Sequence, residues 1–298
     1  MTATTVDPTT RPTLRRTVRS RGRIVRKVRR IPLYVLVTVL LVVMVYPLLW
    51  ILLGSFKTQD EFLNNPTWAL PHDFLNVANY TQAWSSIALY LRNSVVAVFP
   101  ALALVILLGT AAGYALEVMV FRGRSSILLV FLAGIMIPGQ MILLPLFTVY
   151  FKLHLTSTLW PLILTYTATG LPLTVFMMAT YFRSVPREVF EASTLDGASA
   201  VRSFWSIGLP MMRSAVFTIA LVQFFFLWND LLIALTFTTQ DTLRTVQVGL
   251  LNFTGQYGAV DYGPTFAAIC INMLLVLVLY VFLNQRVMRG LSAGAVKG

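Results

Sequence analysis

Long apolar segments alternate with short polar segments along this chain. Six runs of about 20 residues or more are almost free of charge, and only Asp230 places a formal charge inside any of them. A helix needs about 20 apolar residues to cross the hydrocarbon core of a membrane. The pattern therefore predicts an all-α integral membrane protein with six transmembrane helices, at residues 33–56, 94–116, 125–148, 159–182, 214–236 and 263–285.

The composition supports this prediction and divides the chain into two regions. Hydrophobic residues make up 57% of the sequence and charged residues 11%, where soluble globular proteins have about 25% charged residues. We expect a basic tail at 1–32 and one membrane domain at 33–298. The uncharged stretch 31–56 is too long for a cleaved signal peptide and lacks an A-x-A cleavage site. An Arg-rich, acid-poor tail also suits a mitochondrial transit peptide, but a cytoplasmic anchor explains it as well.

Basic residues are distributed unevenly between the loops. With the N-terminus inside, 19 of the 23 Lys and Arg residues fall in inner segments, and the four in outer segments are Lys57, Arg92, Lys152 and Arg244. The positive-inside rule then predicts that both termini are cytoplasmic. A basic tail can bind nucleic acid, but setting the topology and lying on anionic lipid headgroups is the simpler role. We expect membrane lipids as partners and no nucleic acid.

Small and helix-breaking residues lie within the apolar runs. Gly109 and Gly113 of "GTAAG" form a surface on which two helices can approach closely. Pro138 and Gly139 interrupt the third run. Such breaks are tolerated where neighbouring helices or a water-filled cavity satisfy the freed backbone groups, so we expect bent helices around a pathway.

Two outer segments are long enough to carry specificity. Residues 57–93 alternate aromatic with polar and proline positions, which favours a segment lying along the headgroup region. Residues 237–262 are polar and glycine-containing, and we expect an adaptable lip that faces a partner or a substrate.

The chain lacks the groups that an enzyme or a metal centre needs. It has no G-x-x-x-x-G-K-[ST] run, so any ATPase activity would have to belong to another chain. His72 and His154 stand without ligand-spaced Cys or His, which predicts no metal site. A secondary transporter would need more intramembrane acids than Asp230. We expect a chain that is not an enzyme and binds no cofactor itself.

The inner segment 183–213 is predicted to form a helix, a turn and a second helix. Pro186 suits the first turn of a helix, and Asp196-Gly197 is a turn dipeptide. The second helix is expected over residues 198–207, with an end at Gly208 and Pro210. Phe190 and Trp205 are expected to offer apolar contacts. The element could dock into another protein or lie on the lipid surface.

Within this segment, "EASTLDGASAVRSFWSIGLP" at 191–210 resembles the cytoplasmic EAA loop of ABC importer permeases. That loop reads E-A-A, then a Gly four residues after the second Ala, then I-x-L-P. Ser193 replaces the second alanine, and it is small enough to keep the fit. The segments "GYALEVMVFRGR" at 113–124, "FFFLWNDLLIAL" at 224–235 and "GLSAGAVKG" at 290–298 resemble the carbohydrate branch of these permeases, specifically the maltose-type second permease.

The resemblance implies a type I ABC importer permease fold in a bacterial plasma membrane. It implies a heterodimer with a second permease subunit, an ABC ATPase dimer that holds ATP and Mg, and an extracytoplasmic binding protein that delivers sugar, chiefly di- or oligosaccharide. The tail at 290–298 would reach the ATPase dimer, and the 237–262 segment would meet the binding protein. The implied ATPase-coupling residues are Glu191, Ala192, Ser193, Asp196, Gly197, Ala198, Ile207, Leu209 and Pro210.

Two polar positions near the apolar runs have open roles. Asn229 and Asp230 could contact sugar hydroxyls along the substrate path, or they could cap and pin neighbouring helices. Glu117 follows the second run, and we expect it to pair with Arg122 or Arg124.

Overall fold

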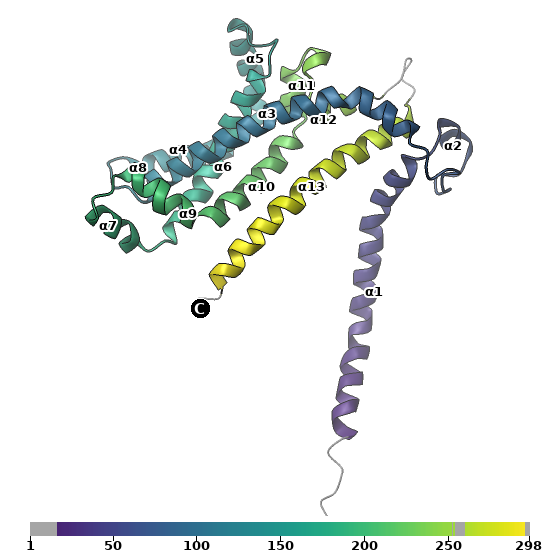
Figure 1. The fold of residues 1–298 in the computed structure, drawn as a ribbon, viewed down its shortest axis with the longest axis horizontal. Helices are drawn as coiled ribbons and strands as arrows, with labels where there is room; N and C mark the ends of the chain where they lie inside the picture. Colours follow the sequence, from purple (N-terminus) through teal and green to yellow (C-terminus); the bar gives the residue numbers. More distant parts are fainter. Residues whose placement is uncertain (1–16, 252, 254–259, 296–298) are drawn as a thin grey trace, which may run out of the picture. The chain divides into compact units, whose positions relative to one another are not determined.

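The computed structural model describes residues 17–251, 253 and 260–295, and their regular secondary structure is helical (Figure 1). Side chains are described over 32–281, except at 252 and 254–259. The chain separates into two compact units, Met1–Leu52 and Leu53–Gly298. The C-terminal tail is helical to Ala295, and its last residues, 296–298, lie outside the described part.

The first unit is a single helix, α1 (Thr17–Gly54), whose last residues belong to the second unit. Its apolar part, Pro32–Gly54, matches the first predicted run and has a mean hydropathy of 2.8. Residues 33–49 are exposed along their whole length. A helix that is apolar all round is typical of a membrane span. The basic tail is helical from Thr17, and residues 1–16 lie outside the described part.

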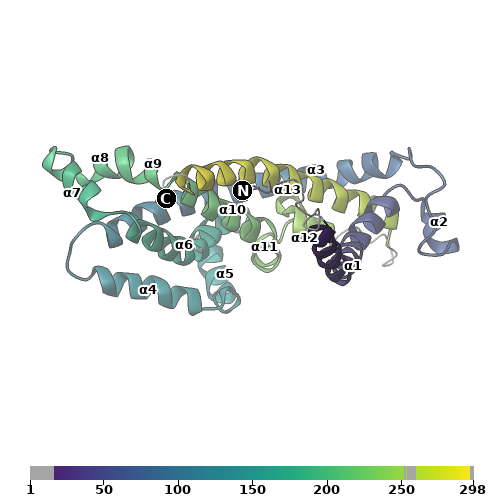
Figure 2. The same cartoon turned by 90° about the horizontal axis from the view of Figure 1, so that it is seen from below.

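Four long helices form the body of the second unit: α3 (Ala78–Glu117), α6 (Trp160–Arg183), α10 (Arg213–Trp228) and α13 (Tyr262–Ala295). Helix α3 packs along α6, α10 and α13 (Figures 1 and 2). A Cβ built on Gly109 would lie 2.4 Å from the Thr174 methyl group, and one on Gly113 would lie 2.6 Å from the Met178 Cβ. The predicted close approach at "GTAAG" is confirmed, and α6 is the partner helix.

Two of the predicted runs are bent rather than straight. The third run consists of α4 (Arg124–Met136), the short helix η1 (Gly139–Ile142) and α5 (Leu143–Lys152), with a 91° bend at the break before Gly139. The fifth run ends as a helix at Trp228 and resumes as α11 (Leu232–Phe237). Within the described residues, four helices are long and apolar enough to cross a membrane. The number rises to six when two bent pairs, Arg124–Met136 with Gly139–Lys152 and Ala200–Met211 with Arg213–Trp228, each count as one span.

Helix α3 starts earlier than the apolar run predicts. It has 40 residues, which gives a length of about 60 Å, roughly twice the thickness of a hydrocarbon core. From Ala78 onward the predicted interfacial segment 57–93 is therefore the first part of α3. The polar residues at 78–93 concealed the early start of α3 from the hydropathy pattern. A helix that extends beyond the hydrocarbon core has no need to be apolar there, so this part of α3 does not belong to an apolar run.

The outer segment before α3 is tied down by hydrogen bonds. Short helix α2 (Gln59–Asn64) has a capping box in which Thr58 and Glu61 satisfy each other's backbone N–H groups. Glu61 also accepts from the His72 N–H at 2.7 Å. Burial tends to raise the pKa of Glu61, but the backbone N–H groups of His72 and Thr58 stabilise its carboxylate, and the net pKa lies below its ordinary value.

The second outer segment is anchored on α3 over its first half, through η3 (Asp241–Leu243) and α12 (Val246–Leu250). The Asn93 amide donates to the carbonyls of Thr242 and Arg244 at 2.8 and 3.0 Å. The Val246 N–H donates to the Ser94 hydroxyl at 2.9 Å. The expected adaptable lip is thus held in place up to residue 251, and most of 252–259 lies outside the described part.

Candidate functional site: the inner helical hairpin

The inner segment forms a hairpin of two helices, α7 (Arg187–Leu195) and α8 (Ala200–Ser203), so the predicted helix–turn–helix is present. Helix α7 ends in a Schellman motif, in which the Ala198 N–H donates to the Ser193 carbonyl and the Gly197 N–H to the Thr194 carbonyl, each at 3.0 Å. Gly197 has φ +78°, the left-handed region that favours glycine. The turn conformation is why the glycine stands at this position.

Two serines join the arms of the hairpin. The Ser193 hydroxyl donates to the Ser203 hydroxyl at 3.1 Å, and both side chains are buried. Ser199 caps α8 by accepting from the Arg202 N–H. The replacement of the second motif alanine by serine therefore places a hydroxyl inside the hairpin, where it has a partner.

The second helix of the hairpin is longer than the sequence predicts. It begins at Ala200 and continues through a π-helical turn, η2 (Phe204–Gly208), into α9 (Leu209–Met211). Gly208 and Pro210 do not end it, so that prediction is wrong. Pro210 stands at the start of α9, directly after the π-helical turn. The chain instead bends by 76° between α9 and α10.

Tyr114, near the end of α3, holds the hairpin on the body of the second unit. Its ring lies 5.4 Å from that of Phe182 on α6, 5.6 Å from that of Phe190 on α7 and 5.3 Å from that of Phe204. All four side chains are buried. Such aromatic contacts contribute roughly 0.5–1.5 kcal/mol each beyond their buried area. The hairpin is therefore packed directly on α3 and α6.

Phe190 was expected to offer an apolar contact to another protein, and the structure corrects this. Its ring is buried against Tyr114, because it lies on the inner face of α7. Trp205, the other residue expected to offer an apolar contact, is exposed, and so are Leu195 and Val201, with Leu195 at 89%. The position of Leu195 one residue before Asp196-Gly197 places it at the tip of the turn. That position was available in the sequence and was missed.

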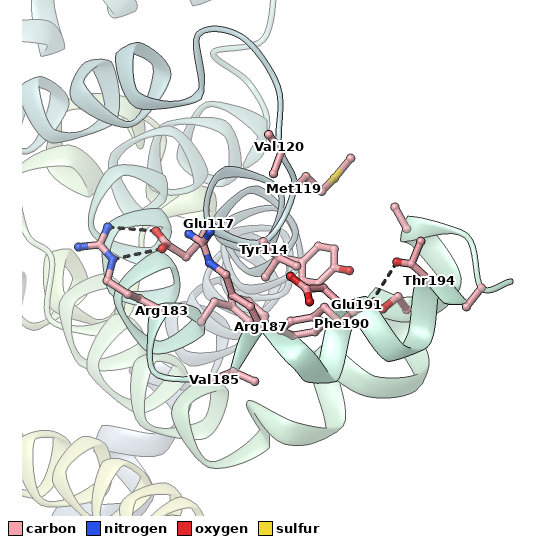
Figure 3. A pocket seen from close by; sticks show the side chains of 15 residues that line it. Tyr114, Glu117, Met119, Val120, Arg183, Val185, Arg187, Phe190, Glu191 and Thr194 are labelled. Atoms are coloured by element: carbon pink, nitrogen blue, oxygen red, sulfur yellow. Dashed lines mark hydrogen bonds and ion pairs between the residues drawn. The ribbon is translucent and has the colours of Figure 1, made fainter. Parts of the chain in front are cut away.

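A cavity of about 450 Å³ lies between the end of α3 and the hairpin (Figure 3). Glu191 and Arg187 of α7 line it, and Figure 3 shows the Glu191 side chain close to the Tyr114 ring. At its edge Glu117 accepts two hydrogen bonds from Arg183, at 3.2 and 3.0 Å. The expected pairing of Glu117 with Arg122 or Arg124 is therefore wrong. Arg183 is the last residue of α6, and α6 packs beside α3, so the loop arginines are not the nearest partners.

The remaining predicted coupling residues fall into two groups, one on the exposed surface of the hairpin and one at its base. Glu191, Ala192, Asp196 and Gly197 are exposed, and Ala198 is partly buried. Ile207, Leu209 and Pro210 lie in the π-helical turn and α9, away from the tip. The structure thus places the first group around one turn, with the second group linking that turn to α10.

Asn229 and Asp230 lie at the break between α10 and α11. The Asp230 carboxylate accepts from the Tyr166 hydroxyl and the Ala234 N–H, each at 3.0 Å, and from the Ile233 N–H at 3.4 Å. The Asn229 amide donates to the Phe225 carbonyl at 3.0 Å. Both residues therefore hold the break together. Asp230 also lines a second cavity of about 450 Å³.

Comparison with known proteins identifies the class. A family model described as "Binding-protein-dependent transport system inner membrane component" matches residues 105–289, a range that contains the hairpin, the Tyr114 contacts and the helix break at Asp230. The chain belongs to this family. It is a permease subunit of an ABC importer, and it resides in the cell membrane as a multi-pass protein.

Individual relatives are similar over most of the chain. The diacetylchitobiose uptake system permease protein NgcG of Streptomyces coelicolor is 37% identical over 85% of this chain and 84% of its own length. The trehalose/maltose transport system permease protein MalG of Thermococcus litoralis is 30% identical over 91% of this chain and 98% of its own length.

A solved structure has the same fold. It is a bacterial ABC transporter involved in the import of the acidic polysaccharide alginate, and it aligns with a TM-score of 0.75 at 19% identity. The alignment covers 92% of this chain and 99% of that one.

Proposed function

We propose that this chain is one of two permease subunits of an ATP-driven importer of di- or oligosaccharides. In this proposal six spans cross the plasma membrane at the six predicted apolar runs, and both termini are cytoplasmic. The chain provides half of the substrate pathway and one docking element for an ATPase. It has no catalytic site of its own, and ATP and Mg are held by the partner ATPase subunits.

The observation that carries the proposal is that one surface of the hairpin is exposed while the other packs on the long helices. Its exposed surface presents Leu195, Val201 and Trp205 to solvent. Its opposite surface packs on the body of the second unit through the rings around Tyr114. An element with an exposed apolar tip and a rigid base can transmit the motion of a partner to membrane helices. ATP changes the permease conformation because the closed ATPase dimer binds one form of it more tightly than the other.

The coupling residues divide into two roles in this proposal. Glu191, Ala192, Asp196, Gly197 and Ala198 form the surface that enters the ATPase cleft. Ser193 keeps the hairpin closed through Ser203. Ile207, Leu209 and Pro210 then join the hairpin to α10, which carries Asn229 and Asp230 at its far end.

The partners are assigned to opposite ends of α3. Helix α2 and the hairpin lie at the two ends of that helix (Figures 1 and 2). The hairpin end faces the ATPase dimer, and the end with α2 and α12 faces the extracytoplasmic sugar-binding protein. The second permease forms a heterodimer with this chain, and lipids surround both.

The names of the relatives guide the choice of substrate. Diacetylchitobiose, trehalose and maltose are disaccharides or their derivatives, and we propose a sugar of this size for this chain.

The proposal is tested by purifying the chain with the permease, ATPase and binding protein encoded beside it. We expect diacetylchitobiose, trehalose or maltose to stimulate ATP hydrolysis in the reconstituted complex, and only when the binding protein is present. The complex without the binding protein is the matched control. If no carbohydrate in a broad panel raises the ATPase rate, the assigned substrate class is wrong.

A further inference from the structure

The second cavity lies where two helices are broken. It is lined by the end of α4, by η1, by the middle of α6, and by α10 with the first turn of α11. It therefore includes the 91° bend before Gly139 and the interruption at Asp230. In membrane transporters, broken helices of this kind tend to surround the substrate, because irregular backbone is tolerated where it lines a cavity.

The side-chain hydrogen-bond donors around this cavity are already in use. The Tyr166 hydroxyl donates to Asp230 at 3.0 Å, and the Thr169 hydroxyl donates to the Thr165 carbonyl at 2.9 Å. The Gln223 amide nitrogen donates to the Gly170 carbonyl at 2.9 Å and to the Thr174 hydroxyl at 2.8 Å. These side chains can still offer hydrogen-bond acceptors to a ligand, chiefly the Gln223 carbonyl oxygen and the Asp230 carboxylate.

Asp230 is the one charged side chain among the described residues that line the cavity. Its Oδ1 atom accepts a single long hydrogen bond, from the Ile233 N–H at 3.4 Å. Lone pairs therefore remain for a ligand. Within an apolar span, a carboxylate acts on its surroundings with little screening.

We propose that this cavity is a sugar subsite that selects uncharged, hydroxyl-rich substrates and rejects acidic sugars, with Asp230 as the specificity-determining residue. Neutral sugar hydroxyls can donate to the Asp230 and Gln223 oxygens. A carboxylate, sulfonate or phosphate group would meet a like charge and no free side-chain donor. The exposed Phe226 ring, which also lines the cavity, provides an apolar wall for a pyranose face. This inference rests on the proposed function, because it places the substrate on this chain.

The test measures the charge selectivity of the cavity directly. Phe226→Cys is introduced with Cys270→Ser, which removes the one native cysteine. The complete transporter in permeabilised membranes is then treated with a cationic and an anionic methanethiosulfonate of similar size, and the two labelling rates are compared. We expect Asp230→Asn to lower the ratio of cationic to anionic rates about tenfold. Asp230→Ser is a second neutral variant that can also cap α11, in case the first does not fold.

The matched control is Leu75→Cys in the segment between α2 and α3, which is exposed and lies away from the hairpin, and it should show the same rate ratio with or without Asp230→Asn. Two results would overturn the proposal: no labelling of Phe226→Cys by either reagent, or an unchanged ratio in both neutral variants. Labelling requires neither transport nor a binding protein. A negative result here therefore leaves the sugar-stimulated ATPase test untouched, and the two failures can be told apart.

Discussion

Sugar uptake is expected to fall at least tenfold when Gly197 is replaced by valine, while the protein remains folded. Gly197 ends α7 with φ +78°, and a side chain in this region costs roughly 1–2 kcal/mol. A Cβ there would meet nothing within 4 Å in this chain, so the fold can accommodate it. The turn, however, must change shape or stay strained, and the surface offered to the ATPase changes with it. Uptake of radiolabelled sugar into cells measures the loss.

Gly123 provides a matched control for that substitution. It also has a left-handed φ, +89°, and a Cβ there would likewise meet nothing within 4 Å. It lies before α4, outside the hairpin. Gly123→Val should therefore bear the same backbone strain and keep most of the uptake. Asn tolerates the left-handed region better than other residues, so Gly197→Asn should retain more activity than Gly197→Val. Equal loss at both glycines would show that strain alone, and not docking, explains the effect.

Replacing Gly113 with leucine is expected to destabilise the protein by about 3 kcal/mol or more, because it overpacks the contact between α3 and α6. The new Cβ would lie 2.6 Å from the Met178 Cβ and 2.9 Å from the Ala179 backbone nitrogen. A backbone atom cannot rotate away as a side chain can, so the two helices must separate. The Tyr114 contacts one residue further along would separate with them. Fluorescence-detected size exclusion after heating, in detergent, reports the stability.

Gly139 serves as the comparison, because a Cβ there would meet nothing within 4 Å. Gly139→Leu should keep the apparent melting temperature close to that of the unmodified protein. If Gly113→Leu melts at the same temperature as Gly139→Leu, the α3–α6 contact is not as close as the structure has it.

The sequence predicted the features that depend on residues close together in the chain. Apolar length located the long helices, and the small residues of "GTAAG" identified a packing surface. The dipeptide Asp196-Gly197 identified the turn of the hairpin, because a left-handed position strongly favours glycine there. These features depend on neighbouring residues alone, and the structure contains each of them.

What the sequence could not supply depends on residues that are distant along the chain. The pairing of Glu117 with Arg183 and the burial of Phe190 follow from the packing of α3 against α6 and α7. The sequence did not indicate that Tyr114 packs against the hairpin, because a tyrosine at the end of an apolar run is usually interpreted as an interfacial residue. Tyr166 was missed as the partner of Asp230 because the two residues lie 64 positions apart in the sequence. In each case the partner is set by tertiary packing.

Photocrosslinking from the two ends of α3 in the assembled transporter tests most directly whether the hairpin end of α3 faces the ATPase. A benzophenone amino acid is placed at Leu195, which is 89% exposed on the hairpin, or at Trp68, which is 77% exposed beyond α2. We expect the Leu195 probe to crosslink to the ATPase and the Trp68 probe never to do so. A Leu195 probe that yields only lipid adducts, or a Trp68 probe that captures the ATPase, would contradict this expectation.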